Sequence, residues 1–282
     1  MTTTLRPTGP LQQAPDGVRS RAYDICVNSR PVGAVELATL PGFGTAIGTL
    51  RSLRVDEPDR RRGRATVAAL AGEEVLRGWG CRQIQVAVPV EATVALRLTE
   101  ALGYTERGRT MAKELTGPPP PLPGNGVTVR PMSEAEFQEW YATAEEAFAR
   151  EWTARGVPEA QARAASETSH RTSLPDGLAT EGTAFHVAVR DGGTVAGHIW
   201  TGRRAPDPGG EPVAYVYDIE VAEGHRGQGY GRALMLAAER TAHAWGLRRI
   251  GLHVFAGNTP AARLYESLGY ATTHVHAFKP LL

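Results

Sequence analysis

A glycine-rich turn at residues 225–231 is the segment whose residue types most directly indicate chemistry. It reads His-Arg-Gly-Gln-Gly-Tyr-Gly and lies between a strand-like segment and a segment with helical periodicity. Glycine lets the backbone bend sharply and approach a ligand closely. The free N–H groups of the first helical turn, together with the helix dipole, would bind an anion. The sequence therefore predicts a phosphate site here, although a plain tight turn has the same composition. Its predicted members are Arg226, Gly227, Gln228, Gly229, Tyr230, Gly231 and Arg232.

Two common nucleotide-binding turns do not fit this segment. A Walker-type loop needs Lys followed by Ser or Thr after its last glycine, whereas Arg232-Ala233 follows here. A dinucleotide-binding turn has the spacing Gly-x-Gly-x-x-Gly and an acidic residue about 20 positions further on. The glycines of this turn alternate instead, and the next strand-like segment begins with Arg248-Arg249. Both classes are excluded at the level of individual residues.

A second motif at residues 258–270 reads Asn-Thr-Pro-Ala-Ala-Arg-Leu-Tyr-Glu-Ser-Leu-Gly-Tyr. Arg226-x-x-Gly229-x-Gly231 resembles the pyrophosphate-binding motif of the GNAT acetyltransferase superfamily. The second motif resembles that family's Asn-x-x-Ala-x-x-Leu-Tyr-x-x-x-Gly-Phe/Tyr signature, in the family's order and spacing. The resemblance covers residues 127–282 well and 18–115 in degenerate form. The second half is similar to a subgroup of small bacterial N-acetyltransferases.

The resemblance implies acetyl-CoA as the donor, a primary amine of a small molecule or peptide as the acceptor, and direct transfer without a metal. The family separates two parallel strands, here 213–221 and 249–255, so that the pantetheine arm lies between them. Backbone N–H groups near Ile219 and Val221 would then stabilise the thioester oxyanion, although strand pairing alone would also explain these two residues. Asn258 and Ala261 would complete the cofactor site, and Asn258 is equally well explained as a helix N-cap.

The resemblance also assigns a general acid, and the acceptor calls for a base. Tyr265 matches the family tyrosine that protonates the departing CoA thiolate, with packing on its helix as the alternative. An amine arrives protonated, so a base is needed, and Asp218, Glu220 and His253 are the candidates. Strand alternation places Asp218 and Glu220 on one face. Glu220 is preferred for its closeness to the expected carbonyl site, and a water relay remains open.

The chain contains an internal duplication at an offset of 166 residues, with 18 identities among the 45 positions from 60 to 104. A proline-rich linker at Thr116–Gly126 separates the copies, because four consecutive prolines cannot continue a helix or a central strand. We therefore expect a disordered tail at 1–17, a degenerate domain at 18–115 and a catalytic domain at 127–282. We call the two repeats the first copy and the second copy.

The positioning elements follow from the same pattern. In the second copy, hydrophobic periodicity predicts helices at 133–155, 159–171, 229–244 and 259–268 among strands at 127–130, 184–190, 194–201, 213–221, 249–255 and 273–279. Ser133 followed by Glu136 is a capping-box signature at the start of the first helix. The first copy has no room for the two leading helices. The predicted fold is two tandem GNAT-like α/β domains with mixed sheets, the first lacking those helices.

The offset shows that the first copy has lost its chemistry. At the positions of Tyr265, Glu220, Asp218, Asn258 and His253 it carries Thr99, Arg54, Ser52, Ala92 and Ala87. We expect a folded, non-catalytic half, with CoA binding at its turn left open. Fusion would create an intramolecular pseudo-dimer, and a further homodimer is also open. The tandem layout resembles mycothiol synthase, but that substrate is not carried over. The rival functions are a non-catalytic acyl-CoA-binding or scaffold protein, and an enzyme regulated by CoA in its first half.

Composition narrows the partners of the chain. The formal net charge of +1 over 282 residues gives no basis for nucleic-acid binding, and no apolar run is long enough for a membrane span. Cys26 and Cys81 are read as buried thiols of a reduced cytoplasm, and no cluster of ligands predicts a metal. Only Lys113 and Lys279 are lysines, which we attribute to coding bias.

Overall fold

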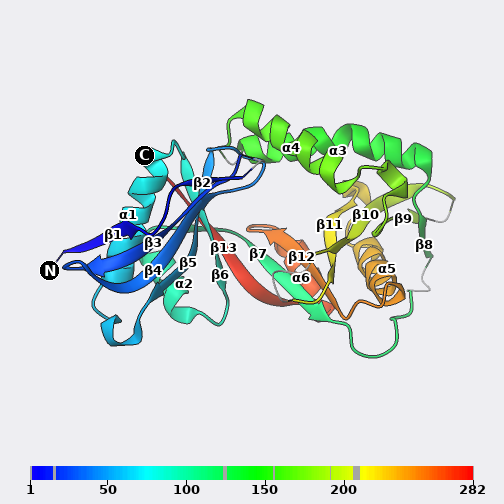
Figure 1. The fold of residues 1–282 in the computed structure, drawn as a ribbon. Coiled ribbons are helices and arrows are strands. Elements are labelled where there is room, and N and C mark those ends of the chain that lie inside the picture. The colour runs from blue at the N-terminus through cyan, green and yellow to red at the C-terminus, as the bar shows by residue number, and fades with distance from the viewer. Residues whose placement is uncertain are drawn as a thin grey trace. The chain divides into compact units, whose positions relative to one another are not determined.

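The computed structural model describes residues 2–14, 17–122, 126–154, 156–190, 192–205 and 210–281 (Figure 1). Two compact units interleave in the sequence. Unit 1 comprises Met1–Arg107, Thr143–Ser173 and Val275–Leu282, and unit 2 comprises Gly108–Ala142 and Leu174–His274. Each unit takes segments from both copies, so the unit boundaries differ from the expected domains at 18–115 and 127–282. Residues 123–125 of the proline-rich linker lie outside the described residues.

Unit 1 is built on a mixed sheet with the strand order β1-β3-β4-β5-β6-β13. Neighbouring strands from β1 to β5 are antiparallel, whereas β5 and β6 run parallel. The core buries Ile25, Leu37, Leu76 and Ile84 completely. The elements that unit 1 draws from the first copy are β1 (Thr3–Pro7), β2 (Gln12–Gln13), β3 (Arg19–Val27), β4 (Arg30–Thr39), β5 (Ile47–Val55), η1 (Glu57–Asp59), α1 (Arg64–Gly78), β6 (Gln83–Pro89) and α2 (Thr93–Ala101).

The N-terminal residues form an edge strand, which corrects the expectation of a disordered tail. β1 pairs antiparallel with β3 from Thr3↔Val27 to Pro7↔Tyr23, and Leu5 packs against the core of unit 1. Pairing satisfies the backbone groups that β3 would otherwise present at a sheet edge. A Thr- and Pro-rich composition carries no signal for such an edge strand, because its pairing partner determines it. Met1, Pro15 and Asp16 of this segment lie outside the described residues.

Unit 1 also contains helical segments from the second copy. These are α4 (Glu159–Ser173) and the part of α3 (Glu134–Ala154) that begins at Thr143. Ala149 and Ala162 of this segment lie in one buried cluster with Phe43 and Ile47 of the first copy. The first copy indeed lacks leading helices of its own, and those of the second copy cover this part of its core.

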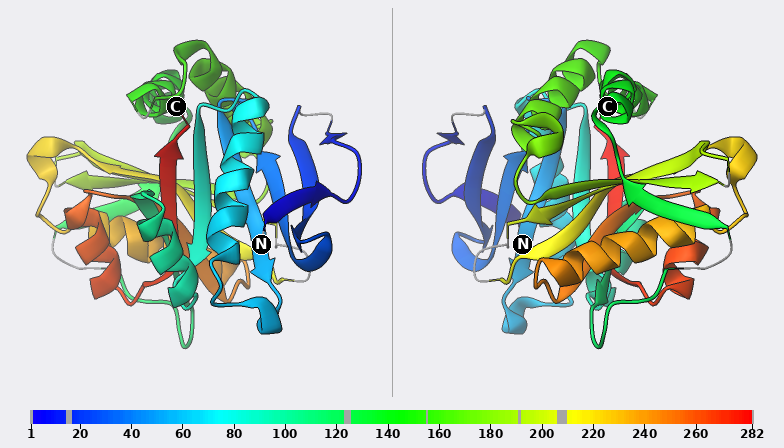
Figure 2. Two further views of the ribbon diagram at one scale, coloured as in Figure 1. Left: turned by 90° about the vertical axis from the view of Figure 1, so that its left-hand side faces the viewer. Right: turned by 90° about the vertical axis from the view of Figure 1, so that its right-hand side faces the viewer.

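Unit 2 has the strand order β7-β12-β11-β10-β9-β8, and only the β11–β12 pair among these described strands is parallel. α5 packs Leu234 and Met235 into the core on one face. The start of α3 covers the other face (Figure 2). Trp140 of this helix contacts Phe185 and Trp200 there. The predicted mixed α/β fold is confirmed. The elements are β7 (Thr105–Glu114), β8 (Val127–Pro131), η2 (Gly177–Ala179), β9 (Thr183–Arg190), β10 (Val195–Arg204), β11 (Val213–Val221), η3 (Glu223–His225), α5 (Tyr230–Ala244), β12 (Arg249–Phe255) and α6 (Thr259–Ser267). β13 (Ala271–Pro280) begins in this unit and belongs to unit 1 from Val275 onward.

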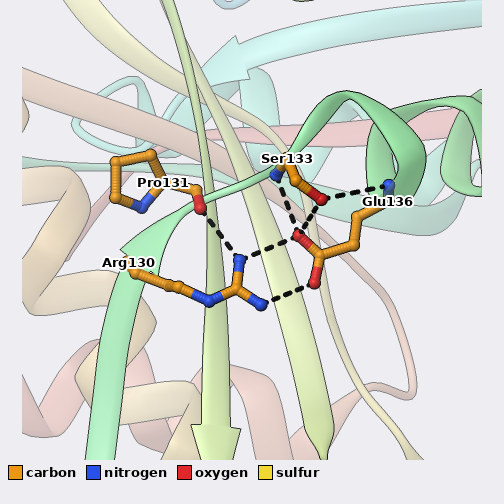
Figure 3. A network of polar contacts seen from close by, with 4 residues as sticks. All are labelled: Arg130, Pro131, Ser133 and Glu136. Atoms are coloured by element: carbon orange, nitrogen blue, oxygen red, sulfur yellow. Dashed lines mark hydrogen bonds and ion pairs between the residues drawn. The ribbon is translucent and has the colours of Figure 1, made fainter. Parts of the chain in front are cut away.

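The predicted capping box starts α3 (Figure 3). The Ser133 amide donates to Glu136 Oε2 over 2.8 Å, and the Glu136 amide donates to Ser133 Oγ over 3.4 Å. Arg130 at the end of β8 adds two hydrogen bonds to the same carboxylate. The hydrogen bond from Arg130, together with those from Ser133, lowers the pKa of Glu136 to about 2. This cap fixes the point where the chain turns from β8 into the helix that covers the site.

The two copies exchange their last strands. β7 and β13 are equivalent by the offset of 166 residues, yet residues 108–114 of β7 pair antiparallel with β12 of the second copy in unit 2. β13 in turn lies beside β6 of the first copy in unit 1, where the Leu281 amide donates to the Arg82 carbonyl oxygen over 2.8 Å. Each sheet is therefore completed by the other copy, as in a domain swap.

The two lysines of the chain hold these exchanged strands. Lys113 of β7 donates to both carboxylate oxygens of Glu239 in α5, each over 2.8 Å. Lys279 of β13 pairs with Glu73 of α1, also over 2.8 Å. Glu239 and Glu73 have side chains only 1% and 5% exposed. The offset relates the two pairs, so the interpretation of these lysines as coding bias misses their shared structural role.

Two further expectations concern the state of the cysteines and the presence of membrane-spanning helices. Cys26 and Cys81 are both free and buried, and burial raises the pKa of the Cys81 thiol to about 11. Both thiols are therefore poorly placed to react. In the described part of the chain, no helix is long and apolar enough to cross a membrane.

Candidate active site

β11 and β12 separate halfway along unit 2. Among the described residues, their parallel pairing joins Ala214–Val216 to Ile250–Leu252. Directly beyond it, β11 carries one extra residue, Tyr217, opposite the Trp200–Thr201 step of β10. Such a bulge bends its strand and increases the local twist. Residues 219–221 stay paired with β10, and their other edge is open toward β12, in agreement with the expected strand separation.

The predicted turn connects the open end of β11 to α5 through backbone that favours glycine. Gly227 has φ 74°, and Gly229, at the N-cap of α5, has φ 90°. These values lie in the left-handed region, where a side chain is strained. Arg226 Nε donates to the Val221 carbonyl oxygen over 3.1 Å and closes the turn against its own strand. The first amides of α5 are thereby held at the end of β11, where they can bind an anion.

α6 forms the opposite side of the site. Asn258 caps it, because its side-chain oxygen accepts a hydrogen bond from the Ala261 amide over 3.3 Å. A Cβ added at Gly231 would lie 3.1 Å from Leu264 Cδ2, so α5 and α6 approach closely at this point. Tyr265, one residue further along α6, is buried. The helix N-cap predicted at Asn258 is confirmed.

A pocket of about 570 Å³ lies between the turn, the open end of β11 and α6. Its lining combines the N-terminus of α5 and two arginines with Tyr265 and the Glu220 carboxylate. The positive charge and the free amides at the turn suit an anionic group. The pocket is lined by most of the residues that the sequence predicts, namely Ile219, Glu220, Val221, Arg226, Gly227, Gly229, Tyr230, Gly231, Arg232, Asn258, Ala261 and Tyr265.

Three predicted site residues do not belong to this lining. Gln228 donates from Nε2 to the Gly224 carbonyl oxygen over 3.1 Å and braces the turn. The His253 ring packs edge-on against Phe255 in β12, with 4.9 Å between ring centroids. Asp218 lies on the face that α3 covers, where other side chains bind its carboxylate. The structure therefore brings Glu220 and Tyr265 together in the pocket and places Asp218 beside it.

The Asp218 carboxylate is held in a hydrogen-bond network. Trp140 Nε1 donates to Oδ2 over 2.9 Å, and His198 Nε2 lies 2.9 Å from the same oxygen. Partial burial raises the pKa of Asp218, but the contacts from His198 and Trp140 and the Ile219 amide outweigh it and lower the pKa below its ordinary value. Asp218 is therefore an anion at neutral pH and a weak base.

Tyr265 keeps its proton at neutral pH. Burial, with a smaller contribution from the Asp218 carboxylate, raises the pKa of its phenol to about 12. Both causes disfavour the phenolate, because burial removes water and a nearby negative charge repels another. The Tyr265 hydroxyl is thus available as a hydrogen-bond and proton donor, and it lines the pocket.

Sequence reasoning misses five residues of this region. His225, Pro260 and Leu264 also line the pocket, and they lie within the two quoted motifs without carrying a recognised chemistry. His198 and Trp140 bind Asp218 from β10 and α3. A signal for His198 exists, because β10 sets it directly opposite Glu220 and the corresponding pair in unit 1 is Ala34 and Arg54.

Comparisons with known proteins agree with this geometry. The sequence model of the acetyltransferase (GNAT) family matches residues 6–104 and 137–270, which covers both copies. A solved structure described as a tandem GNAT protein from the clavulanic acid biosynthesis pathway has a TM-score of 0.55 and 19% identity, covering 96% of this chain and 85% of its own. That likeness concerns the fold.

Two relatives show the family at sequence level. The uncharacterized N-acetyltransferase YycN of Bacillus subtilis is 30% identical over 157 residues, which are 55% of this chain and 99% of the relative. A mycothiol acetyltransferase of Thermobispora bispora is 31% identical over 239 residues, 83% of this chain and 71% of the relative. With both copies matched by the family and the second carrying the pocket, the chain belongs to the acetyltransferase (GNAT) family of N-acetyltransferases.

Proposed function

We propose that the second copy transfers the acetyl group of acetyl-CoA directly to a primary amine. The observation that carries this proposal is the pocket in which the glycine turn, the open end of β11 and Tyr265 meet. An anionic group would bind at the turn, and Tyr265 would serve as a proton donor in the same pocket. A phosphate-bearing thioester needs both.

The turn would bind the pyrophosphate of CoA. The amides at the start of α5 and the helix dipole favour negative charge, and Arg226 and Arg232 line the same end of the pocket. Because Gly227 and Gly229 have no side chain, a ligand can approach the backbone there. Apart from the two chain neighbours of each glycine, the described residues place no atom within 4 Å of a Cβ added at either position. The pantetheine arm would follow the open edge of β11 toward Tyr265, past Asn258 and Ala261.

The Val221 amide is the donor that we assign to the thioester oxygen. The Ala222 amide donates to the Ala196 carbonyl oxygen beside β10, over 2.9 Å. Successive amides of a strand point to opposite sides, so the Val221 N–H points toward the open edge. The Ile219 amide points the same way but interacts with the Asp218 carboxylate. A backbone donor at the developing oxyanion is typical of acyl transfer.

Tyr265 would supply the proton to the departing thiolate. Burial that raises the pKa of Tyr265 to about 12 also disfavours a thiolate in the same pocket. A thiolate formed there is therefore a stronger base than in water, which favours its protonation. For the base, Glu220 is the one of the three predicted candidates that lines the pocket, whereas Asp218 and His253 are engaged elsewhere.

The remaining parts of the proposal concern partners. The acceptor is a small-molecule or peptide amine, and the first amine screen includes mycothiol-related amines because one relative carries that name. We further propose a cytoplasmic protein that binds neither nucleic acid nor membrane. The exchanged strands support an intramolecular pseudo-dimer of the two copies.

Calorimetric titration of acetyl-CoA tests the proposal. We expect one site per chain, lost in Gly229→Asp because charge and bulk enter the anion site. The matched control, Gly63→Asp, changes the equivalent turn of the first copy and should leave that site intact. Two sites would show that the first copy also binds CoA and would favour the regulated enzyme. Absence of binding would overturn the acetyl-transfer proposal in favour of a scaffold.

A further inference from the structure

His198, Asp218 and Trp140 form a connected network on the face of unit 2 that α3 covers. His198 Nε2 and Trp140 Nε1 both lie 2.9 Å from the same oxygen, Oδ2 of Asp218. The Trp140 nitrogen is an obligate donor, so it fixes the carboxylate from the side of α3. His198 approaches from β10. His198 is not among the base candidates that the sequence predicts.

The network determines which nitrogen of His198 carries the proton. Asp218 is ionised at neutral pH, so it only accepts hydrogen bonds. The contact with Oδ2 then requires a hydrogen on Nε2, and in the neutral ring the lone pair is left on Nδ1. Ionised Asp218 would also stabilise the imidazolium that forms when Nδ1 takes up a proton. An oriented histidine of this kind is a typical general base.

The position of His198 relates it to the pocket. In the register of β10 and β11, His198 stands opposite Glu220, which lines the pocket. Directly opposite residues have Cβ atoms about 4.5–5.5 Å apart. Tyr265, on the other side of the pocket, senses the Asp218 charge. The side chains of His198 and Asp218 are 19% and 40% exposed, so neither is sealed in the core.

We propose that His198 accepts the proton of the incoming ammonium group, with Asp218 as its positioning residue and Trp140 holding Asp218. This inference rests on the proposed acetyl transfer. It replaces a carboxylate base by an imidazole whose Nε2 contacts Asp218, so that the Nδ1 lone pair is not used by that contact.

The groups described above account for every proton that moves in the reaction. One ammonium proton passes to His198 Nδ1, and the neutral amine attacks the thioester carbonyl carbon. The C–S bond breaks, and its electron pair leaves on sulfur. Tyr265 gives its proton to that thiolate, and the second proton of the former ammonium restores the Tyr265 hydroxyl. His198 then releases its proton to solvent, so the net reaction yields the amide, CoA thiol and one proton.

Groups from four elements face His198. From β11 they are the carboxylates of Asp218 and Glu220. From α3 the facing side chain is the Trp140 ring, 6.3 Å away, while Glu136 of that helix is paired with Arg130. β9 presents the neutral Val187 opposite His198, and Tyr265 of α6 stays protonated.

Nitrogen-15 NMR of histidine-labelled protein tests the positioning without any knowledge of the acceptor. His198→Gln assigns the signal. We expect the Nε2–H tautomer in the wild type, and Asp218→Asn should lower the pKa of His198 measured by the titration. Trp140→Phe keeps the ring but removes its donor, and it should shift the His198 signal less than Asp218→Asn does. An Nδ1–H tautomer, or a pKa unchanged by Asp218→Asn, would overturn the proposal.

A pair of acceptors that differ in protonation tests the chemistry. At pH 7 ethylamine is protonated, whereas trifluoroethylamine is largely neutral and needs no base before attack. His198→Gln should lower kcat/KM for ethylamine about 100-fold, a value ordinary for general base catalysis, and should spare trifluoroethylamine. Glu220→Gln is the comparison variant, and a larger selective loss there would transfer the role to Glu220. Equal losses for both amines would also overturn the assignment.

The two tests separate this proposal from the acetyl-transfer proposal. If the wild type acetylates neither amine and does not bind acetyl-CoA, the acetyl transfer itself fails, and the NMR experiment still decides whether His198 is oriented by Asp218. If the wild type acetylates ethylamine and His198→Gln retains full activity, acetyl transfer stands and the role of His198 is wrong.

Discussion

The two glycine turns have the same backbone conformation but differ in their side chains. Arg60 Nε donates to the Val55 carbonyl oxygen over 2.9 Å, as Arg226 does to Val221 in the other turn. Gly63 begins α1 with φ 70°, matching Gly229 at the start of α5. The backbone of an anion site thus survives in a copy whose predicted catalytic positions have changed.

The side chains at the first turn form a buried ion pair that the second turn lacks. Asp59 and Arg64 are 4% and 5% exposed and form an ion pair, and Asp59 also pairs with Arg30 over 2.9 Å. The offset places His225 and Tyr230 at the positions of Asp59 and Arg64, and in unit 2 their rings pack 5.8 Å apart. A buried carboxylate therefore replaces a histidine that lines the pocket. The comparison teaches that the two copies keep the same path of the backbone and differ in the charged groups placed around it.

The largest predicted effect concerns the lysine–glutamate pair that each unit contains. Lys113→Met leaves the carboxylate of Glu239 buried without its cation, which should cost about 3 kcal/mol of unfolding free energy. Lys279→Met should cost unit 1 a similar amount through Glu73. Denaturant unfolding, with hydrogen exchange of α5 and α1, measures each loss separately.

The matched control removes both members of one pair. Lys113→Met combined with Glu239→Leu should recover most of the stability, because apolar replacement of a buried pair is often neutral. If the single and double variants have the same free energy of unfolding, the loss does not come from the unpaired Glu239 carboxylate. The proposed common role of the two lysine–glutamate pairs is then wrong.

The second largest effect concerns Tyr265, which has no equivalent tyrosine in the first copy. Tyr265→Phe should lower kcat at least about tenfold while leaving the Kd for CoA nearly unchanged, since only the proton donor is lost. Thr99→Val changes the equivalent position of the first copy and should leave kcat unaltered. Steady-state kinetics and calorimetry measure the two quantities. A Tyr265→Phe enzyme with full turnover would contradict the assignment.

A smaller effect isolates the backbone of the turns. Arg61 occupies φ 59°, where the second turn has Gly227 at φ 74°. Arg61→Gly should stabilise unit 1 by about 0.5–1 kcal/mol, because the left-handed conformation is costly for a residue with a side chain. Gly227→Arg should destabilise unit 2 by a similar amount. Midpoints of thermal unfolding reveal both changes, and shifts of the same sign would refute the reciprocal relation.

The smallest effect concerns the cap of α3, which has no counterpart in the first copy. The pKa of Glu136 is lowered from 4.5 to about 2. Its contribution to stability is therefore complete above about pH 4.5 and is lost as the pH falls toward 2. Glu136→Gln should remove this part of the acid dependence, whereas Glu134→Gln should keep it. Acid titrations followed by circular dichroism compare the three proteins.

Local patterns in the sequence predicted the turns and caps around the candidate site. The turn at 226–231, the cap at Asn258 and the capping box at Ser133 each depend on neighbouring residues, and the structure places each turn and cap as expected. The duplication also correctly indicated that the first copy lacks leading helices. Such features are readable because the residues that make them lie within a few positions of one another.

The features that sequence reasoning missed depend on distant partners. Asp218 is engaged by Trp140, 78 residues away, and by His198, 20 residues away. Hydrophobic periodicity does not predict the exchange of β7 and β13, because each strand could equally have completed the sheet of its own copy. One signal was present: Lys113 and Lys279 are related by the same offset of 166 residues that relates the two copies.

The strand exchange has a consequence for how the protein is made. Most of unit 1 is synthesised before the second copy, yet its sheet is completed by β13, which follows the other strands of the second copy. Domains usually fold in order of synthesis, but here the sheet of the first copy waits for a strand of the second. A nascent chain must therefore keep the edge of β6 from aggregating until β13 has been made, and a gene cut between the copies would encode two unfinished units.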